Sequence, residues 1–270
     1  MKRLALPLVL ISLALLLSCC QKEDRLRPDC SNPFFGLYSP YAQVKTVRHI
    51  VPGSAGGGDS IPCLSMQWLG LRLISVAHNQ DSGQSETYRY DQHNRLAAID
   101  SNVLFTYNGA GLLASIKVYH DEMTRVIMFQ YDGQLLPTQM TDSIFMHPSS
   151  GFQDWYGSSQ TYQLEWMKGN LEKATPVNDS LMRYEYIYDD NHNPFSGLAL
   201  SRILIGQNIL EHPTFFCLNN VKDVFGYNPD GSVGYYCHYD YDYNNGWPLV
   251  VRRQPSLVGD SVQTFILSYR

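Results

Sequence analysis

A short pattern of an aromatic residue, a polar turn and an apolar residue recurs along most of the chain. Eight copies align, and they begin at Trp68, Tyr90, Tyr107, Tyr131, Trp166, Tyr188, Tyr227 and Tyr243. In each copy the aromatic residue ends one predicted strand, Asp or Asn with Gly supplies positive-φ turn positions, and the next strand begins at Leu or its equivalent. Chance in a chain with 19 Tyr accounts for about two or three such pieces. The pattern therefore predicts a series of β-hairpins.

The hairpins constrain the overall architecture. Eight of them supply about sixteen strands, and two further strand-like runs, Ala42–Val51 and Val262–Tyr269, flank the series. The turn Asn228–Gly231 is the clearest, because Pro229 is preset for the first corner and Gly231 tolerates the left-handed one. Strand twist accumulates in so large a sheet and free edges promote aggregation. We therefore predict an all-β fold: a large antiparallel meander that forms a closed or nearly closed barrel.

Three segments interrupt the hairpin pattern. Val51–Ser60 is rich in Gly and predicts a loop, and Gly151–Ser159 predicts a long exposed excursion between strands. Within Gly197–Leu218, apolar residues have a spacing that predicts one short helix; they are Leu200, Ile203, Leu204, Ile209 and Leu210.

The N-terminus has the features of a secretory signal. Lys2 and Arg3 precede an apolar run that is too short to span a membrane and that ends at Ser18 and Cys19. The stretch Leu16-Leu17-Ser18-Cys19 resembles the lipobox of bacterial lipoproteins, which implies cleavage after residue 18 and acylation of Cys19. Acylation at Cys20 would place a Cys where a small residue is usual. Each buried methylene contributes ~0.8 kcal/mol, so several acyl chains hold a protein firmly at a membrane.

The segment after Cys19 indicates a location. Gln21-Lys22-Glu23-Asp24 resembles the export signal of Bacteroidota lipoproteins, which implies the outer membrane and its cell-surface face, with the periplasmic face as the alternative. Residues 19–40 contain three prolines and predict a tether, so residues 41–270 form the predicted barrel domain.

Charge and cysteine content exclude several classes of protein. Without residues 1–18 the chain has 18 Lys plus Arg against 25 Asp plus Glu, a net charge of −7, and no basic cluster, which argues against a nucleic-acid partner. The cysteines after Cys19 are odd in number and include no C-x-x-C pair; they are Cys20, Cys30, Cys63, Cys217 and Cys237. Their spacing indicates no disulfide framework and leaves their pairing open.

Two resemblances bear on the fold. Tyr90-Asp91-Gln92-His93-Asn94-Arg95-Leu96 resembles the YD repeat of Rhs and teneurin proteins. The lipobox, the tyrosine-rich hairpins, the Tyr188–Phe195 segment, Asn219–Val221 and the Tyr243–Pro248 turn together resemble a family of uncharacterised Bacteroidota lipoproteins with a porin-like β-barrel, which implies a fold and no activity. Charged residues occur on both alternations of the predicted strands, as at Glu86 and Arg89. They favour a soluble, lipid-anchored barrel over one inserted in the bilayer.

The stretch GYYCHYDYDYNNG, residues 234–246, invites a metal hypothesis. On a strand, His238, Asp240 and Asp242 share one face, which is either a solvated face or a polar lumen. An EF-hand does not fit, because Gly occupies the seventh position and Val251 the twelfth. A zinc site would need a further ligand from a neighbouring strand. We therefore favour a solvated face and predict no metal and no cofactor.

Aromatic residues in loop or turn contexts are the best candidates for a binding site. Trp155, Tyr156 and Trp247 are suited to stacking against sugar rings, and no G-x-S-x-G, Walker or H-E-x-x-H motif is present. We predict no catalytic residues and a non-enzymatic module that binds a glycan or another small ligand. The alternatives are an envelope scaffold that docks a partner protein, and a hydrolase whose carboxylates come together only in space.

Overall fold

The computed structural model describes residues 43–51, 59–70, 72–78, 85–120, 123–133, 135–146, 157–196, 208–255 and 262–269. The predicted signal peptide, Cys19, the tether, and the candidate residues Trp155 and Tyr156 lie outside these ranges. Among the described residues, no helix is long and apolar enough to cross a membrane.

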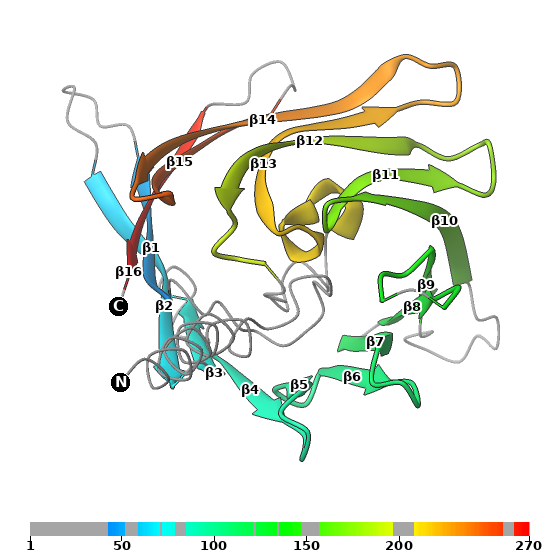
Figure 1. The fold of residues 1–270 in the computed structure, drawn as a ribbon, viewed down its shortest axis with the longest axis horizontal. Coiled ribbons are helices and arrows are strands. Elements are labelled where there is room, and N and C mark those ends of the chain that lie inside the picture. Colours follow the sequence, from blue (N-terminus) through cyan, green and yellow to red (C-terminus); the bar gives the residue numbers. More distant parts are fainter. Residues whose placement is uncertain are drawn as a thin grey trace, which may run out of the picture.

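Sixteen antiparallel strands form one closed barrel in which each strand pairs with its neighbours in sequence and β1 pairs with β16 (Figure 1). This closure confirms the predicted all-β meander, and the two flanking runs form β1 and β16. The strands are β1 Val44–Val51, β2 Asp59–Leu69, β3 Arg72–His78, β4 Ser85–Tyr90, β5 Leu96–Ile99, β6 Val103–Tyr107, β7 Leu113–His120, β8 Met123–Gln130, β9 Gln139–Met146, β10 Gly157–Met167, β11 Asn170–Pro176, β12 Arg183–His192, β13 Asn219–Tyr227, β14 Val233–Asn244, β15 Trp247–Pro255 and β16 Gln263–Tyr269.

At one end of the barrel, a circle of aromatic side chains joins neighbouring strands by hydrogen bonds. We call this end the aromatic rim; odd-numbered strands begin there and even-numbered strands end there. Near the end of each of the eight even strands, a Tyr hydroxyl or Trp N–H donates to a backbone carbonyl near the start of the odd strand before it, at 2.5 to 2.9 Å. The donor and acceptor pairs are Trp68 and Val44, Tyr90 and Leu73, Tyr107 and Leu96, Tyr131 and Leu113, Trp166 and Pro137, Tyr188 and Leu171, Tyr241 and Val221, and Tyr269 and Pro248.

Two of the eight predicted copies do not place their aromatic residue in this set of hydrogen bonds at the aromatic rim. Tyr227 does end a strand before a turn, but β13 is an odd strand, so this turn lies at the opposite end of the barrel, the far rim. In the β14–β15 hairpin the ring position belongs to Tyr241 and not to Tyr243, and Tyr269 supplies the last member. The predicted turn chemistry holds at both places, because Gly231, Asn245 and Gly246 have positive φ.

The two faces of the barrel wall differ in polarity. Side chains alternate along each strand, and on β12 Tyr184 and Tyr186 are buried inside whereas Arg183 and Glu185 face outward. The inward positions of other strands are also apolar and fully buried; they include Leu73, Val76, Ile116, Ile127, Met140 and Leu171. The outer wall carries charged side chains such as Arg183 and Glu185 together with exposed apolar ones such as Met128 and Ile187.

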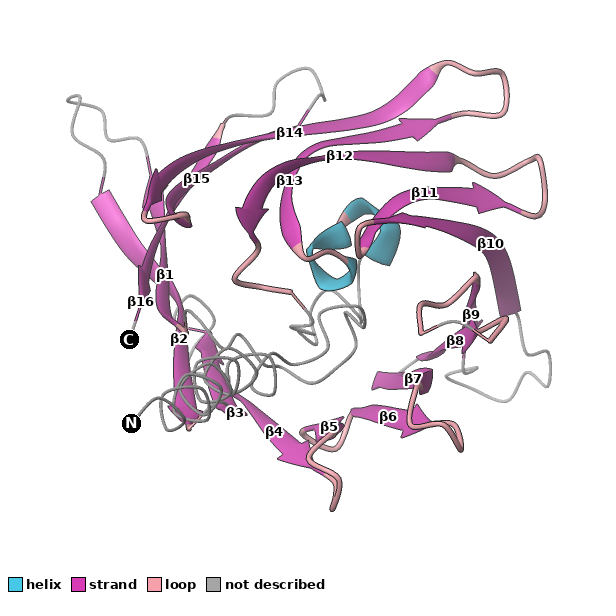
Figure 2. Cartoon of the chain, viewed as in Figure 1, coloured by secondary structure: helices cyan, strands magenta, loops and turns pink. Residues whose placement is uncertain are grey.

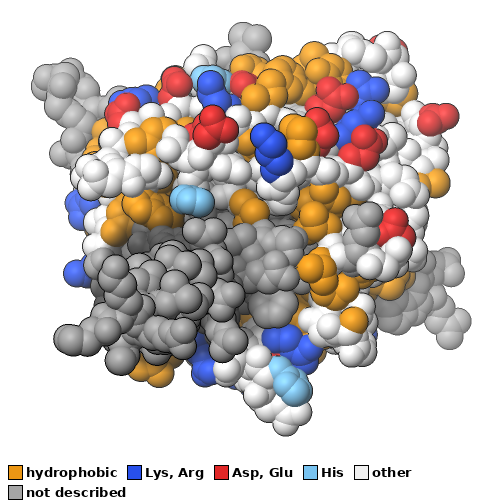
Figure 3. Space-filling model, in the orientation of Figure 1, with side chains coloured by type: hydrophobic (Ala, Val, Ile, Leu, Met, Phe, Trp, Pro, Cys, Tyr) orange, Lys and Arg blue, Asp and Glu red, His pale blue; other side chains and the backbone are white. Residues whose placement is uncertain are grey.

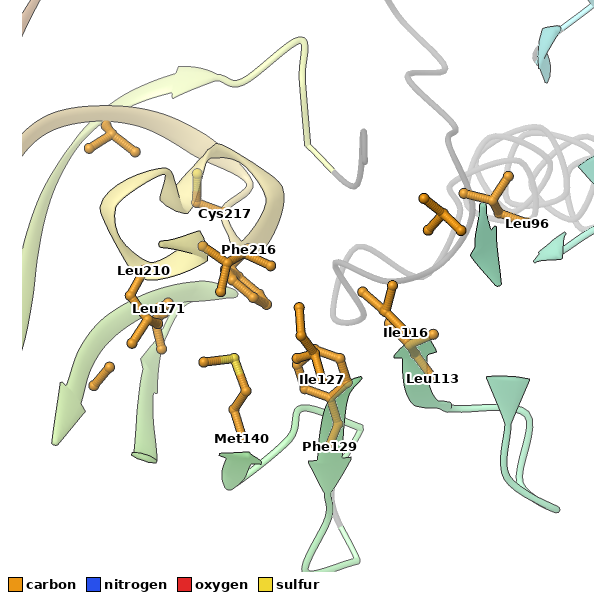
Figure 4. Close-up of a cluster of buried hydrophobic side chains, with 14 of the residues drawn as sticks. Leu96, Leu113, Ile116, Ile127, Phe129, Met140, Leu171, Leu210, Phe216 and Cys217 are labelled. Carbon is orange, nitrogen blue, oxygen red and sulfur yellow. The ribbon is translucent and has the colours of Figure 1, made fainter. Parts of the chain in front are cut away.

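The segment between β12 and β13 contributes to the core. It contains two 3-10 helices, η1 Ile209–Glu211 and η2 Pro213–Phe216, which lie inside the ring of strands (Figure 2). Phe216 makes an edge contact with the ring of Phe129 at a centroid distance of 6.2 Å (Figure 4). It makes a second edge contact with the ring of Trp166 at 6.5 Å. The predicted short helix is therefore two 3-10 turns, and Leu200, Ile203 and Leu204 lie outside the described residues.

Asparagine side chains hold this inserted segment at the aromatic rim. The Asn170 side-chain oxygen accepts from the backbone N–H groups of Leu218 and Asn219 at 2.8 and 2.9 Å. The Asn193 amide donates to the carbonyl of Cys217 at 3.1 Å. Cys217 and Cys237 are both buried as free thiols, so neither takes part in a disulfide.

Candidate binding site on the outer wall

The stretch at residues 234–246 forms β14 and its turn, and its two faces separate as alternation predicts. Cys237 and Tyr239 are buried inside the barrel, whereas Asp240 and Asp242 are exposed on the outer wall. His238 shares the outer face and its side chain is 29% exposed. His238, Asp240 and Asp242 thus face outward and do not line the lumen.

The neighbouring strand β13 presents further side chains beside them. Asp223 pairs with His238 across the two strands, and Phe225 pairs with Tyr236. Tyr227 continues the same outward row toward the far rim. We call these five residues the outer-wall patch. Charged side chains of both signs gather along the upper edge of the view in Figure 3, where Figure 1 places β14.

The aromatic members of the patch form a continuous row. The rings of Phe225 and Tyr227 are nearly parallel, with centroids 6.1 Å apart and an interplanar angle of 17°. The ring of Tyr236 lies 4.9 Å from that of Phe225. The guanidinium carbon of Arg183 lies 4.9 Å from the Tyr227 ring centroid and ends the row. All three rings are partly exposed, so the row offers apolar edges and faces to a ligand.

Asp223 organises the polar half of the patch. Its Oδ1 accepts a 2.9 Å hydrogen bond from the Tyr236 hydroxyl and lies 2.7 Å from His238 Nδ1. Asp240 Oδ1 lies 3.5 Å from the other ring nitrogen of His238. The hydrogen bond to Asp223 raises the pKa of His238 above its ordinary value, with a further contribution from the charge of Asp240. The imidazole is thus fixed in orientation between two carboxylates.

Close packing inside the barrel supports the patch from below. Gly226 lies between Phe225 and Tyr227 and points inward, and a Cβ atom there would lie 2.9 Å from Tyr235 Cβ and 3.2 Å from the Tyr184 ring. The absence of a side chain leaves room for the buried Tyr184 and the partly buried Tyr235, which pair with Gly226 from the two neighbouring strands. The outward row therefore lies on a well-packed strand, and a rigid support of this kind favours ordered binding side chains.

Beside the patch, Asp242 is committed to an ion pair. Arg252 on β15 donates from Nη1 to Asp242 Oδ1 at 3.1 Å, and its Nη2 also contacts the other carboxylate oxygen. Among the residues that the structure describes, no group of three or more His, Cys, Asp or Glu side chains is arranged to hold a metal ion. Residues 238–242 contribute hydrogen bonds and ion pairs to Asp223 and Arg252.

Trp247 lies at the aromatic rim, away from the outer-wall patch. Its ring is half-buried between His192 and Tyr269, at centroid distances of 5.7 and 6.2 Å. The Tyr269 hydroxyl donates to the Pro248 carbonyl and so belongs to the circle of hydrogen bonds at this rim. Trp247 therefore packs against the wall, and of the three predicted aromatic candidates it is the one within the described residues.

A histidine and a carboxylate do converge inside the barrel. His78 Nε2 lies 2.9 Å from Glu86 Oε1, and the hydroxyl of Tyr88 donates to Glu86 Oε2 at 2.8 Å. His78 and Glu86 are each only 4% exposed. This pair bears on the hydrolase alternative, which requires a histidine and a carboxylate in one place, but both side chains are buried in the wall.

Asp223, Phe225 and Tyr227 were not among the site residues predicted from the sequence. Their alternation with Val224 and Gly226 in the run DVFGY was the available signal, because it places a carboxylate and two aromatic rings on one strand face. That they meet Tyr236 and His238 depends on the register of β13 against β14, which no single stretch of sequence specifies.

No protein-family model matches the chain, and no curated protein matches it. Its structural neighbours include a porin-like protein from Bacteroides vulgatus ATCC 8482, with 12% identity and a TM-score of 0.41 over 85% of this chain and 99% of that one. A porin-like protein from Bacteroides uniformis ATCC 8492 is similar with 11% identity and a TM-score of 0.42 over 86% of this chain and 99% of that one. The structure of TcdB2-TccC3-Cdc42 is similar with 12% identity and a TM-score of 0.31 over 83% of this chain and 15% of that one.

Proposed function

We propose that this protein is a lipid-anchored, non-enzymatic glycan-binding module of the bacterial outer membrane, and that the outer-wall patch contacts the glycan. The observation that carries the proposal is the row of Phe225, Tyr227 and Tyr236 beside Asp223 and His238. Aromatic rings provide apolar surface with little loss of conformational entropy, and neighbouring carboxylate and imidazole groups can hydrogen-bond sugar hydroxyls.

The polarity of the wall supports the anchor. Outward charges occur on strands around the barrel, as at Arg89, Lys117 and Glu185, and such side chains are costly at the middle of a bilayer. A protein with this surface needs a separate attachment to stay at a membrane, and the predicted acylation of Cys19 supplies one. The barrel then stands in water, where its outer wall is accessible to polysaccharides.

The direct test is a binding screen with the purified barrel against soluble starch, dextran, xylan, mannan and polygalacturonate. Tyr227→Ala and Tyr236→Ala remove two rings of the patch, and we expect each to weaken binding about tenfold, because stacked aromatic contacts contribute on the order of 1 kcal/mol or more. Tyr119→Ala is the matched control: Tyr119 is 43% exposed on β7, far from the patch.

Four outcomes discriminate the alternatives. Saturable binding that the patch variants weaken and the Tyr119 variant leaves unchanged supports the proposal. Equal weakening by all three variants contradicts the patch as the site. No binding to any polysaccharide, together with a partner protein recovered by crosslinking in cells, favours the envelope scaffold, and cleavage of a polysaccharide during the assay favours the hydrolase.

A further inference from the structure

The outer side of β7–β10 carries almost no charge. The residues that face outward there alternate within Ser115–Tyr119, Thr124–Gln130, Gln139–Phe145 and Gly157–Gln163, and cross-strand pairing aligns them in rows. We call these outward residues the neutral wall. Lys117 is its one charged member, and its other side chains are hydroxyl, amide or apolar groups. Depletion of charge is typical of the centre of a protein interface.

Three large apolar side chains protrude from the neutral wall. Tyr119, Met128 and Phe145 are 43%, 44% and 38% exposed. Tyr119 and Phe145 lie in one row, on either side of Thr124, and Met128 lies two rows away on the middle strands. Tyr, Phe and Met are the apolar residue types that are enriched where proteins contact one another. A partner surface that covered this wall would remove all three side chains from water.

The hydroxyl groups of the neutral wall are paired with one another. Thr141 Oγ1 lies 3.1 Å from Thr161 Oγ1, and Ser143 Oγ lies 2.9 Å from Ser159 Oγ. Burial of a polar group is costly mainly when the group loses its hydrogen-bond partner. These hydroxyls keep their partners when they are covered, so a second protein surface can lie over them at low cost.

The charge of the whole chain favours a second copy as the partner. Without residues 1–18 the net charge is −7, so two copies repel each other unless they meet at a face without negative charge. The β14–β15 wall is not such a face, because Asp240, Asp242 and Arg252 reach solvent there. The neutral wall is one, and it lies at the lower right of Figure 1, away from β14. It also lacks the charge complementarity that would select a different charged partner.

We propose that two copies of this chain pair through their neutral walls to form a symmetric dimer. In a two-fold pair the same patch meets itself, and an uncharged patch is compatible with its own copy. Four strands about 4.8 Å apart, with outward residues spread over seven positions of about 3.4 Å each, give the wall an area of about 500 Å². Standard interfaces bury about 800 Å² per partner, so we expect a weak dimer with a dissociation constant on the order of micromolar.

The dimer leaves the outer-wall patch uncovered, because β11 and β12 separate β10 from β13. A two-fold axis that runs along the barrel axis places both aromatic rims on the same side. Strand β1 follows the predicted tether and begins at this rim, at Val44. Two copies anchored in one membrane can therefore pair in this arrangement and present two patches to a glycan. This orientation rests on the proposed anchor, whereas the pairing itself does not.

The test is sedimentation velocity of residues 20–270 under reducing conditions, at concentrations from about 1 to 300 μM. We expect the wild type to shift from monomer to dimer across this range. Met128→Glu places a charge in the interface and should weaken association about tenfold or more. The matched control is Ile187→Glu, because Ile187 is 49% exposed on the outer side of β12 and lies outside the neutral wall. Its association should equal that of the wild type.

Several results overturn the proposal: the wild type stays monomeric at every concentration, Met128→Glu associates as tightly as the wild type, or Ile187→Glu weakens association equally. A wild-type monomer that binds phospholipid vesicles through Met128 would assign the wall to lipid and also contradict the dimer. If Met128→Glu does not fold, as judged by far-UV circular dichroism, Phe145→Glu decides by the same criteria. Tyr227→Ala separates this proposal from glycan binding, because it weakens glycan binding and leaves dimerisation unchanged.

Discussion

The hydroxyl of Tyr107 donates a 2.8 Å hydrogen bond to the backbone carbonyl oxygen of Leu96, which is the last residue of the stretch YDQHNRL. Within that stretch Asp91 accepts from the backbone N–H groups of His93 and Arg95 and pairs with the Arg95 side chain at 2.7 Å. Arg95 in turn places its guanidinium carbon 4.3 Å from the Tyr107 ring centroid. Each element of the repeat therefore either closes its own turn or contacts the next hairpin.

We expect Tyr107→Phe to lower the free energy of unfolding by about 1 kcal/mol, because the Leu96 carbonyl loses its side-chain donor while the ring still fills the same space. Urea unfolding followed by circular dichroism measures the change. Tyr119→Phe removes an exposed hydroxyl on the outer wall and is expected to change the free energy by less than about 0.5 kcal/mol. Equal losses in the two variants would show that the rim bond contributes nothing specific.

Gly226→Ala tests the packing beneath the outer-wall patch. The added Cβ would lie 2.9 Å from Tyr235 Cβ, an atom that cannot move without its strand, so we expect a loss of about 2 kcal/mol in the free energy of unfolding. Gly109→Ala is the control, because a methyl group at that position would have no atom within 4 Å, and the expected change is below about 0.5 kcal/mol. If Gly226→Ala left the free energy of unfolding unchanged, β13 and β14 would have to separate easily.

The Asp223–His238 pair makes stability depend on pH. Because the hydrogen bond to Asp223 raises the pKa of His238 in the folded protein, the stabilisation that it provides is fully present below the ordinary histidine pKa of about 6.5. It is lost as the pH rises through the raised pKa of the folded protein. An NMR titration of the His238 ring should show the raised midpoint in the wild type.

The matched variant for that titration is Asp223→Asn, which keeps the shape of the side chain and removes its charge. We expect the His238 midpoint to move down toward its ordinary value, and the advantage in stability at pH 6 relative to pH 9 to shrink. An unchanged midpoint would assign the shift to Asp240 instead, whose carboxylate lies 3.5 Å from the other ring nitrogen.

Lipid attachment is tested in cells with labelled palmitate. We expect the wild-type chain to incorporate label and to fractionate with outer membranes, and Cys19→Ala to lose both properties because it has no thiol to acylate. Cys20→Ala is the control, with labelling expected to persist. Labelling of the Cys19 variant would place the acylated residue elsewhere.

Much of the fold was predictable because its determinants are local. The positive-φ turns at Gly231, Asn245 and Gly246 follow from the residue types that tolerate that conformation. Six of the eight predicted aromatic residues occupy the ring, since the repeat spacing matches one hairpin per copy. The turn after Tyr227 has the same chemistry as the others, and only the direction of the strand tells the two rims apart.

The candidate site was less predictable because it depends on register and on side-chain direction. Alternation separates His238, Asp240 and Asp242 from Tyr235, Tyr239 and Tyr241 of β14, but one strand alone does not reveal which face is inside. The turn context of Trp247 predicts an aromatic available to a ligand, and its sequence does not reveal that the ring lies between His192 and Tyr269. The inward arginine and the outward arginine at positions 253 and 252 are likewise indistinguishable until the barrel closes.

Hydrogen exchange measured by mass spectrometry, with and without a bound polysaccharide from the panel, shows directly where the glycan lies. We expect slower exchange in peptides that cover β13 and β14, residues 219–244, and no change in β7 and β8, residues 113–130. Protection confined to the aromatic rim around Trp247, or spread evenly over the barrel, would contradict the outer-wall patch as the place where the glycan binds.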